Sequence, residues 1–308
     1  MLQVASVTAS CEGGSLRIVF RLTSQFKRSE GAPVTTTSLT APDAASDAPR
    51  HAADPATTGA PDVAAPADAP REGAGTAPGA PPPPAVLDAR AAHVRGARGA
   101  VFGPLDATSA QPVTVVLGDR GSGRTSFLLA TAGRMRLTSG RLTVLGRDTS
   151  RAAAAVRQRA GIAGFDGIDD LEPVVSVGAV VRERLSWESP WYRRTPRVTA
   201  ARLTALLGPV LGDVPVPEPG LLVRDLSEAQ DLLVRVALAL LARPEVLVVD
   251  DLDAVKNPHE RAVVARCLEA LTDPAHPQHV RAVVLGSADP RDTDLLTPDR
   301  TAVVTLTR

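Results

Sequence analysis

The nine residues Gly118–Ser126, which read GDRGSGRTS, have the types and spacing of a loop that binds phosphate groups. The glycines let the backbone turn so that its N–H groups face an anion, and a helix N-terminus adds partial positive charge there. The chain departs from the pattern Gly-x-x-x-x-Gly-Lys-Ser/Thr at one position, where arginine replaces lysine. The residues that we expect to contact phosphates are Gly118, Gly121, Ser122, Gly123, Arg124, Thr125 and Ser126.

Two carboxylates follow an apolar run in the segment PEVLVVDD. Asp250 stands at the end of the predicted strand, where a carboxylate can hold the Mg²⁺ of a bound nucleotide directly or through water. The Thr125 hydroxyl is the second expected Mg²⁺ contact. Asp251 stands where a catalytic base could lie. The sequence therefore predicts a nucleotide site with Thr125 and Asp250 as metal ligands and Asp251 as the catalytic residue.

Strands and helices alternate from about residue 86 onward, and these elements must position the loop and the carboxylates. Apolar runs and alternations predict strands at 101–108, 112–118, 140–146, 246–250, 282–287 and 302–306. Helical spacing predicts helices at 124–135, 174–187, 199–211, 228–242 and 258–271. This order predicts an α/β fold with a mainly parallel sheet and helices on both faces.

The first part of the chain has a different composition. Alanine and proline dominate from Gly31 to Pro84, and no aromatic residue occurs between Phe26 and Phe102. Such a segment cannot bury enough apolar surface to offset its ordering entropy, so we expect residues 1–85 to be disordered. One short stretch, SLRIVFRLTSQF, alternates like an isolated strand. The globular domain is predicted to span residues 86–308.

Composition and charge exclude several kinds of partner. The formal net charge of zero gives no general field for nucleic acid, and we expect no nucleic-acid partner. Cys11 and Cys267 lie far apart, and the histidines lack metal-site spacing, which favours a reducing compartment without a zinc site. No apolar run is long enough to predict a membrane-spanning helix, and no secretion signal is evident at the N-terminus.

A longer segment around the second motif resembles a known family. Asp225–Asp253 reads DLSEAQDLLVRVALALLARPEVLVVDDLD, which is similar to the signature helix and Walker B strand of ATP-binding cassette (ABC) ATPases. Leu226, Ser227 and Gln230 match the family's Leu-Ser-Gly-Gly-Gln signature. The resemblance extends upstream to a hairpin before the phosphate loop and downstream to VVLGSADP, so it covers the chain from about residue 86 onward.

The resemblance implies an ABC-type P-loop fold with an antiparallel β subdomain and a helical subdomain at about 166–228. It implies that ATP and Mg²⁺ are the cofactors and that Ser227 contacts the ATP held by an opposing cassette. It further implies an integral membrane transporter subunit on a separate chain, and a homodimer or a heterodimer with another cassette. The expected location is cytoplasmic, at the membrane through these partners.

Departures from the family's pattern gather on the reaction path. They are Arg124 for the Walker A lysine, Asp251 for the catalytic glutamate, Glu228 for a signature glycine, Ala288 for the switch histidine, and Asp166, Asp169 and Asp170 where a glutamine is expected. Because a displacement of ~1 Å can cost on the order of 100-fold in rate, hydrolysis should suffer more than binding. Two functions stay open: a subunit that hydrolyses ATP slowly to drive a membrane partner, and a catalytically inactive nucleotide-binding or scaffolding subunit.

Overall fold

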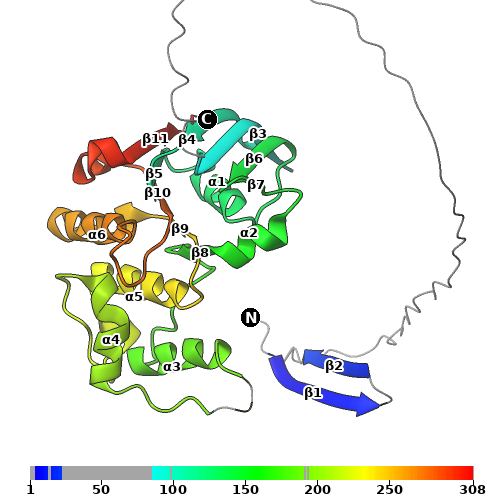
Figure 1. Cartoon of the computed structure of the whole chain (residues 1–308), viewed down its shortest axis with the longest axis vertical. Coiled ribbons are helices and arrows are strands. Elements are labelled where there is room, and N and C mark those ends of the chain that lie inside the picture. Colours follow the sequence, from blue (N-terminus) through cyan, green and yellow to red (C-terminus); the bar gives the residue numbers. More distant parts are fainter. Residues whose placement is uncertain are drawn as a thin grey trace, which may run out of the picture. The chain divides into compact units, whose positions relative to one another are not determined.

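The computed structural model describes residues 4–12, 15–22, 85–97, 99–190, 192 and 194–307. Most of the region that was predicted to be disordered therefore lies outside the described residues. Within that region, β1 (Val4–Glu12) and β2 (Ser15–Leu22) pair as an antiparallel hairpin (Figure 1). The second of these strands coincides with the alternating stretch SLRIVFRL.

A five-stranded parallel sheet forms the centre of the domain that begins near residue 85. Its strands are β5 (Val113–Leu117), β8 (Ala160–Ala163), β9 (Val246–Val249), β10 (Ala282–Ser287) and β11 (Thr301–Thr305), in the order β11-β5-β10-β9-β8. All neighbouring strands run parallel. Every residue of β9 and β10 is buried, which explains why their sequences are continuous apolar runs. The predicted parallel α/β fold is confirmed.

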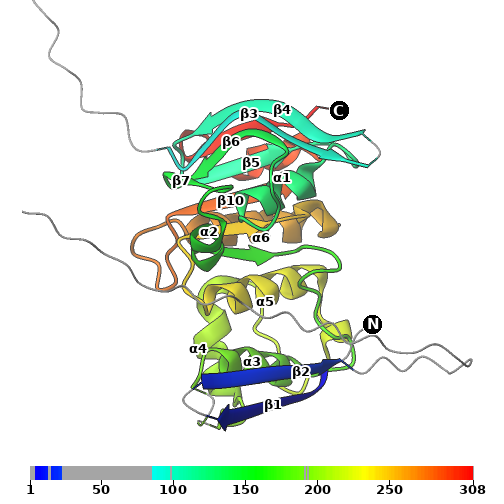
Figure 2. The ribbon, with the colours of Figure 1, turned by 90° about the vertical axis from the view of Figure 1, so that its right-hand side faces the viewer.

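A second, antiparallel sheet lies over one side of this domain (Figure 2). It contains β3 (Leu87–Gly96), β4 (Gly99–Ser109), β6 (Ser139–Val144) and β7 (Arg147–Asp148), in the order β4-β3-β6-β7. Helix α1 (Arg124–Thr131) contacts strands of both sheets. Its Phe127 ring meets the ring of Phe102 on β4 edge to face, at 5.4 Å between centroids. This packing holds the start of α1 against the antiparallel sheet.

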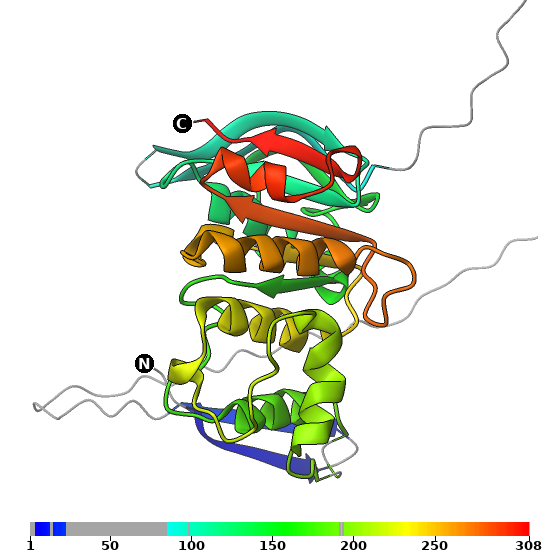
Figure 3. The same cartoon turned by 90° about the vertical axis from the view of Figure 1, so that its left-hand side faces the viewer.

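Helices cover the other side of the parallel sheet. Helix α5 (Glu228–Leu240) packs on β8 and β9, and α3 (Val177–Trp187) and α4 (Ala200–Leu211) lie beyond it (Figures 1 and 3). Helix α6 (Pro258–Ala270) begins at the side-chain cap of Asn257, with Pro258 at its first position. Helices α3 and α4 fall within the range predicted for a helical subdomain. Of the described helices, none has both the length and the apolar character that crossing a membrane requires.

Several short elements were not predicted from the sequence, and two of them directly follow one another in the domain that contains the parallel sheet. They are α2 (Ala153–Arg159) and the edge strand β8, which reads AGIA. Alanine and glycine have little preference for strands, so the local sequence of β8 carries almost no signal. The strand forms because it pairs in parallel with β9, from Ala160 opposite Val246 to Ala163 opposite Val249. It leads the chain into the acidic segment that begins at Gly164.

Candidate nucleotide-binding site

The glycine loop connects the end of β5 to the start of α1. Gly121 and Gly123 have φ angles of 88° and 87°, in the left-handed region that favours glycine. A Cβ atom at Gly123 would overlap the carbonyl oxygen of Val101 on β4. Gly123 is also the N-cap of α1, where no side chain caps the helix and no acidic residue occupies the first turn. The N–H groups at this helix terminus are therefore left for an anion.

One hydroxyl in the loop is buried without a partner. Ser122 is 4% exposed, and its Oγ has no hydrogen-bond partner among the described residues. It lies against Gly118, where a Cβ atom would collide with it. Because buried polar atoms are usually paired, the orphaned Oγ indicates that a ligand belongs in this loop. The predicted contacts Thr125 and Ser126 follow in the first turn of α1, exposed and half-buried respectively.

Arg124 does not project freely from the loop but is held against the acidic end of β9. Its Nε lies 3.3 Å from Asp250 Oδ1, and its Nη2 lies 3.1 Å from Asp251 Oδ1 and 3.5 Å from Asp253 Oδ1. Its Nη1 donates to the carbonyl oxygen of Gly118 at 3.1 Å. The structure thus brings the predicted phosphate-contacting arginine together with the predicted metal ligand and the predicted catalytic residue.

The three carboxylates differ in their surroundings. Asp250 is 3% exposed, and its Oδ1 also accepts the backbone N–H of Asp251 at 2.9 Å. Asp251 adopts left-handed backbone angles, and burial, followed by the neighbouring Asp253, raises the pKa of its carboxyl. Asp253 accepts the backbone N–H of Ala288 at 3.0 Å, so residue 288 joins the site through its main chain. Asp253 was missed in the sequence, although the pattern DDLD places it two residues after Asp251.

Ser227 and Glu228 of the signature segment already make hydrogen bonds within the chain. Ser227 Oγ accepts the Gln230 backbone N–H at 3.2 Å while Gln230 Oε1 accepts the Ser227 N–H at 3.1 Å, which makes a capping box. Glu228 accepts the backbone N–H of Lys256 at 2.7 Å and pairs with its Nζ at 3.1 Å. The Lys256 N–H lowers the pKa of Glu228. Ser227, Glu228 and Asp251 line one groove of about 1000 Å³, although Ser227 does not contact the Arg124 cluster.

The acidic segment where a glutamine was expected is tied to α5. Arg235 Nη2 lies 2.6 Å from Asp169 Oδ1 and 3.3 Å from Asp170 Oδ1. Asp169 also accepts the backbone N–H groups of Gly164 and Phe165, at 3.0 and 2.7 Å. Asp169 and Asp170 therefore hold the loop after β8 in place. Asp166, which is exposed, and Asp170 line the same groove as Asp251.

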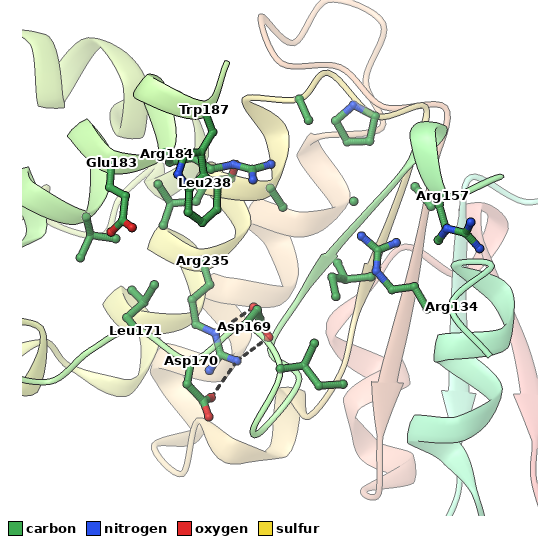
Figure 4. A pocket seen from close by; sticks show the side chains of 18 of the residues that line it. Arg134, Arg157, Asp169, Asp170, Leu171, Glu183, Arg184, Trp187, Arg235 and Leu238 are labelled. Carbon is green, nitrogen blue, oxygen red and sulfur yellow. Dashed lines mark hydrogen bonds and ion pairs between the residues drawn. The ribbon is translucent and has the colours of Figure 1, made fainter. Parts of the chain in front are cut away.

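A second groove of about 630 Å³ lies between β8, α3 and α5 (Figure 4). Its rim carries Trp187, which is 68% exposed, with the Arg184 guanidinium carbon 5.7 Å from the centre of the ring system. Charged side chains of both signs line the groove, among them Arg134, Arg157, Asp170, Glu183 and Arg184 (Figure 4). An exposed tryptophan beside a groove is typical of a surface that binds another protein.

The chain was compared with known protein families, proteins and structures. Residues 107–254 match the family model described as ABC transporter. No curated protein matched the sequence. Among solved structures, cbiO1 from Clostridium perfringens, part of the ABC transporter complex cbiONQ, is 18% identical with a TM-score of 0.54, over 68% of this chain and 81% of that chain. The ATP-binding cassette MJ0796, a dimer bound to ADP and Pi, is 15% identical with a TM-score of 0.54, over 71% of this chain and 94% of that chain.

The matched region contains the glycine loop, the signature segment and the Asp250–Asp253 cluster. The two similar structures share the fold at low sequence identity. The expected architecture, a P-loop fold with an added antiparallel sheet and a group of helices, is confirmed. Residues 107–254 are therefore similar to the ABC transporter family model, and the chain has the fold of ABC ATPases.

Proposed function

We propose that this chain is the ATP-binding subunit of an ABC transporter complex and that it binds the phosphates of ATP at the loop Gly118–Ser126. The observation that carries the proposal is the uncapped N-terminus of α1 behind left-handed Gly121 and Gly123, beside the unpartnered Ser122 hydroxyl. Backbone N–H groups and a helix dipole that converge on one point favour a polyanion. Thr125 and Asp250 supply oxygen atoms of the kind that Mg²⁺ prefers.

The arrangement of the carboxylates favours binding over hydrolysis. Hydrolysis needs a group that orients the water attacking the γ-phosphorus, and Asp251 is the candidate for this role. Its side chain is one methylene shorter than the glutamate of the family pattern, and without nucleotide it pairs with Arg124 at 3.1 Å. The expected switch position holds Ala288, which has no side-chain donor or acceptor. The second candidate function, a catalytically inactive nucleotide-binding or scaffolding subunit, is favoured by the shortened carboxylate at residue 251 and by the alanine at residue 288.

We expect the purified chain to bind ATP in calorimetry but to release phosphate at the same low rate before and after Asp251→Ala. The reason is that the Asp251 carboxylate is one methylene too short to orient the attacking water, so its removal leaves the turnover rate unchanged. A fall of about 10-fold or more in Asp251→Ala would instead identify Asp251 as a base and the chain as a slow ATPase. Absence of binding at millimolar ATP would contradict the proposed nucleotide site. A scaffolding subunit would then be the remaining candidate function.

The proposed partner is an integral membrane subunit on a separate chain, with this chain at the cytoplasmic face of the membrane. The 630 Å³ groove beside Trp187 is the proposed contact for that subunit. A second cassette, identical or different, is proposed to cover the glycine loop and Ser227. Sedimentation with and without ATP distinguishes a homodimer, which forms from this chain alone, from a heterodimer, which does not.

We expect Trp187→Glu to reduce recovery of the chain with the membrane fraction of its native cells. Removal of an aromatic hot-spot contact typically costs about 2 kcal/mol or more of binding energy, and a carboxylate adds a desolvation cost. Val303→Glu is the matched control, because Val303 is 50% exposed on β11 and does not line the groove. Equal losses in the two variants, or no loss in Trp187→Glu, would exclude the groove as the docking site.

A further inference from the structure

We propose that Arg124 is the resident cation of the nucleotide-free site and keeps divalent cations away from Asp250 until phosphate draws the guanidinium out. The exclusion of cations concerns the nucleotide-free protein and stands without the proposed function. Only the release of Arg124 by phosphate rests on that proposed function. The inference starts from the contacts between one guanidinium and three carboxylates, Asp250, Asp251 and Asp253.

The residues of the site fit Mg²⁺ in their chemistry. Asp250 and Thr125 carry oxygen atoms that can act as Mg²⁺ ligands. Three carboxylates face one guanidinium, so the cluster has an excess of negative charge. As the side chains are arranged, however, no three His, Cys, Asp or Glu residues within the described part of the chain could hold a metal ion together. The residue types that a cation needs are therefore present, but the side chains are arranged around Arg124.

The guanidinium is fixed where it competes with a metal ion. Asp250 Oδ1 accepts from Arg124 Nε and from the backbone N–H of Asp251, so this one carboxylate oxygen is engaged within the chain. The Arg124 side chain is 12% exposed. The Asp250 carboxylate, which Arg124 contacts, is packed so closely on Gly286 that a Cβ atom at residue 286 would overlap it. A divalent cation at Asp250 would lie beside a positive charge in a partly desolvated site, which costs energy.

Arginine is needed for this arrangement. Its planar fork lets Nε and Nη2 reach Asp250 and Asp251 while Nη1 donates to the Gly118 carbonyl. A lysine ammonium is a compact point charge and cannot bridge these separated groups at once. Phosphate oxygens are strong acceptors for guanidinium and compete with the carboxylates. We therefore infer an order of events: phosphate first draws Arg124 away, and the divalent cation then gains access to Asp250.

The test measures Mn²⁺ binding without nucleotide, by the loss of the free-ion signal in electron paramagnetic resonance. We expect wild-type protein to bind no Mn²⁺ at about 0.1 mM, within the range of weak carboxylate sites. Arg124→Gln, which removes the charge and the atoms beyond the Nε position, should bind one equivalent. The melting temperature of Arg124→Gln should fall by about 5–10 °C and be partly restored by 10 mM Mg²⁺, whereas that of wild type should not respond.

The control is Arg124→Gln/Asp250→Asn, which should lose the added Mn²⁺ binding if Asp250 is its ligand. Binding of Mn²⁺ to nucleotide-free wild type would overturn the proposal without any variant. Failure of folded Arg124→Gln to bind Mn²⁺ would also overturn it. If that variant does not fold, Arg124→Lys is measured in its place. We expect Arg124→Lys to bind Mn²⁺ more tightly than wild type does, but more weakly than is predicted for Arg124→Gln. ATP binding in calorimetry is scored separately, so failure of the nucleotide site is distinguishable from failure of cation exclusion.

Discussion

Gly123→Ala is expected to abolish ATP binding and to destabilise the domain. Residue 123 has a φ of 87°, which costs a residue with a Cβ atom about 1–2 kcal/mol. The new methyl group would also overlap the Val101 carbonyl oxygen and the Phe102 side chain on β4, and such overpacking typically costs about 1–3 kcal/mol more. Urea unfolding measures the loss of stability, and calorimetry measures the loss of ATP binding.

Gly121→Ala provides the matched control for this experiment. Its φ of 88° is nearly the same as that of Gly123, but no heavy atom lies within 4 Å of the position of its Cβ. This variant should therefore lose only the backbone contribution of about 1–2 kcal/mol. If both variants lose the same stability, the close approach of the loop to β4 contributes nothing, and the described packing of the loop is wrong.

Arg235→Ala is expected to destabilise the domain through the loss of its ion pairs. The side chain is 12% exposed and pairs with Asp169 at 2.6 Å, Asp170 at 3.3 Å and Asp231 at 3.5 Å. Removing Arg235 leaves the mostly buried Asp169 without its cation, which costs about 3 kcal/mol, the lower end for buried pairs, since Asp170 and Asp231 are 50% and 34% exposed and add little. The free energy of unfolding in urea should fall by this amount. The loop that Asp169 anchors through Gly164 and Phe165 should also exchange its amide protons faster.

The control for Arg235 is another arginine that makes a short ion pair on the surface. Arg291 Nη2 lies 3.0 Å from Asp289 Oδ2, but its side chain is 86% exposed. Arg291→Ala should leave the unfolding midpoint unchanged, because exposed pairs contribute little to stability. An Arg235→Ala protein as stable as Arg291→Ala would show that the acidic segment does not depend on this contact, and that Asp169 and Asp170 are free for another role.

Much of the fold was predictable because its signals are local. The runs VTVV, VLVV and AVVL each fill a buried strand, and their residues are apolar because both faces of the sheet are covered. The helix from Glu228 begins where a serine and a glutamine have capping-box spacing. Strand β8 was not predictable, because AGIA becomes a strand only when β9 lies beside it.

The sequence by itself determined the glycine loop, the order of strands and helices, and the positions where the chain departs from the ABC pattern. Glycines and apolar spacing act over a few residues, so these features can be derived without a tertiary structure. Only the folded chain decided which charges meet. Arg124 pairs with carboxylates 126 and 127 residues away, and Glu228 binds Lys256. A guanidinium selects its partners by distance and desolvation in the folded state, and local sequence contains neither.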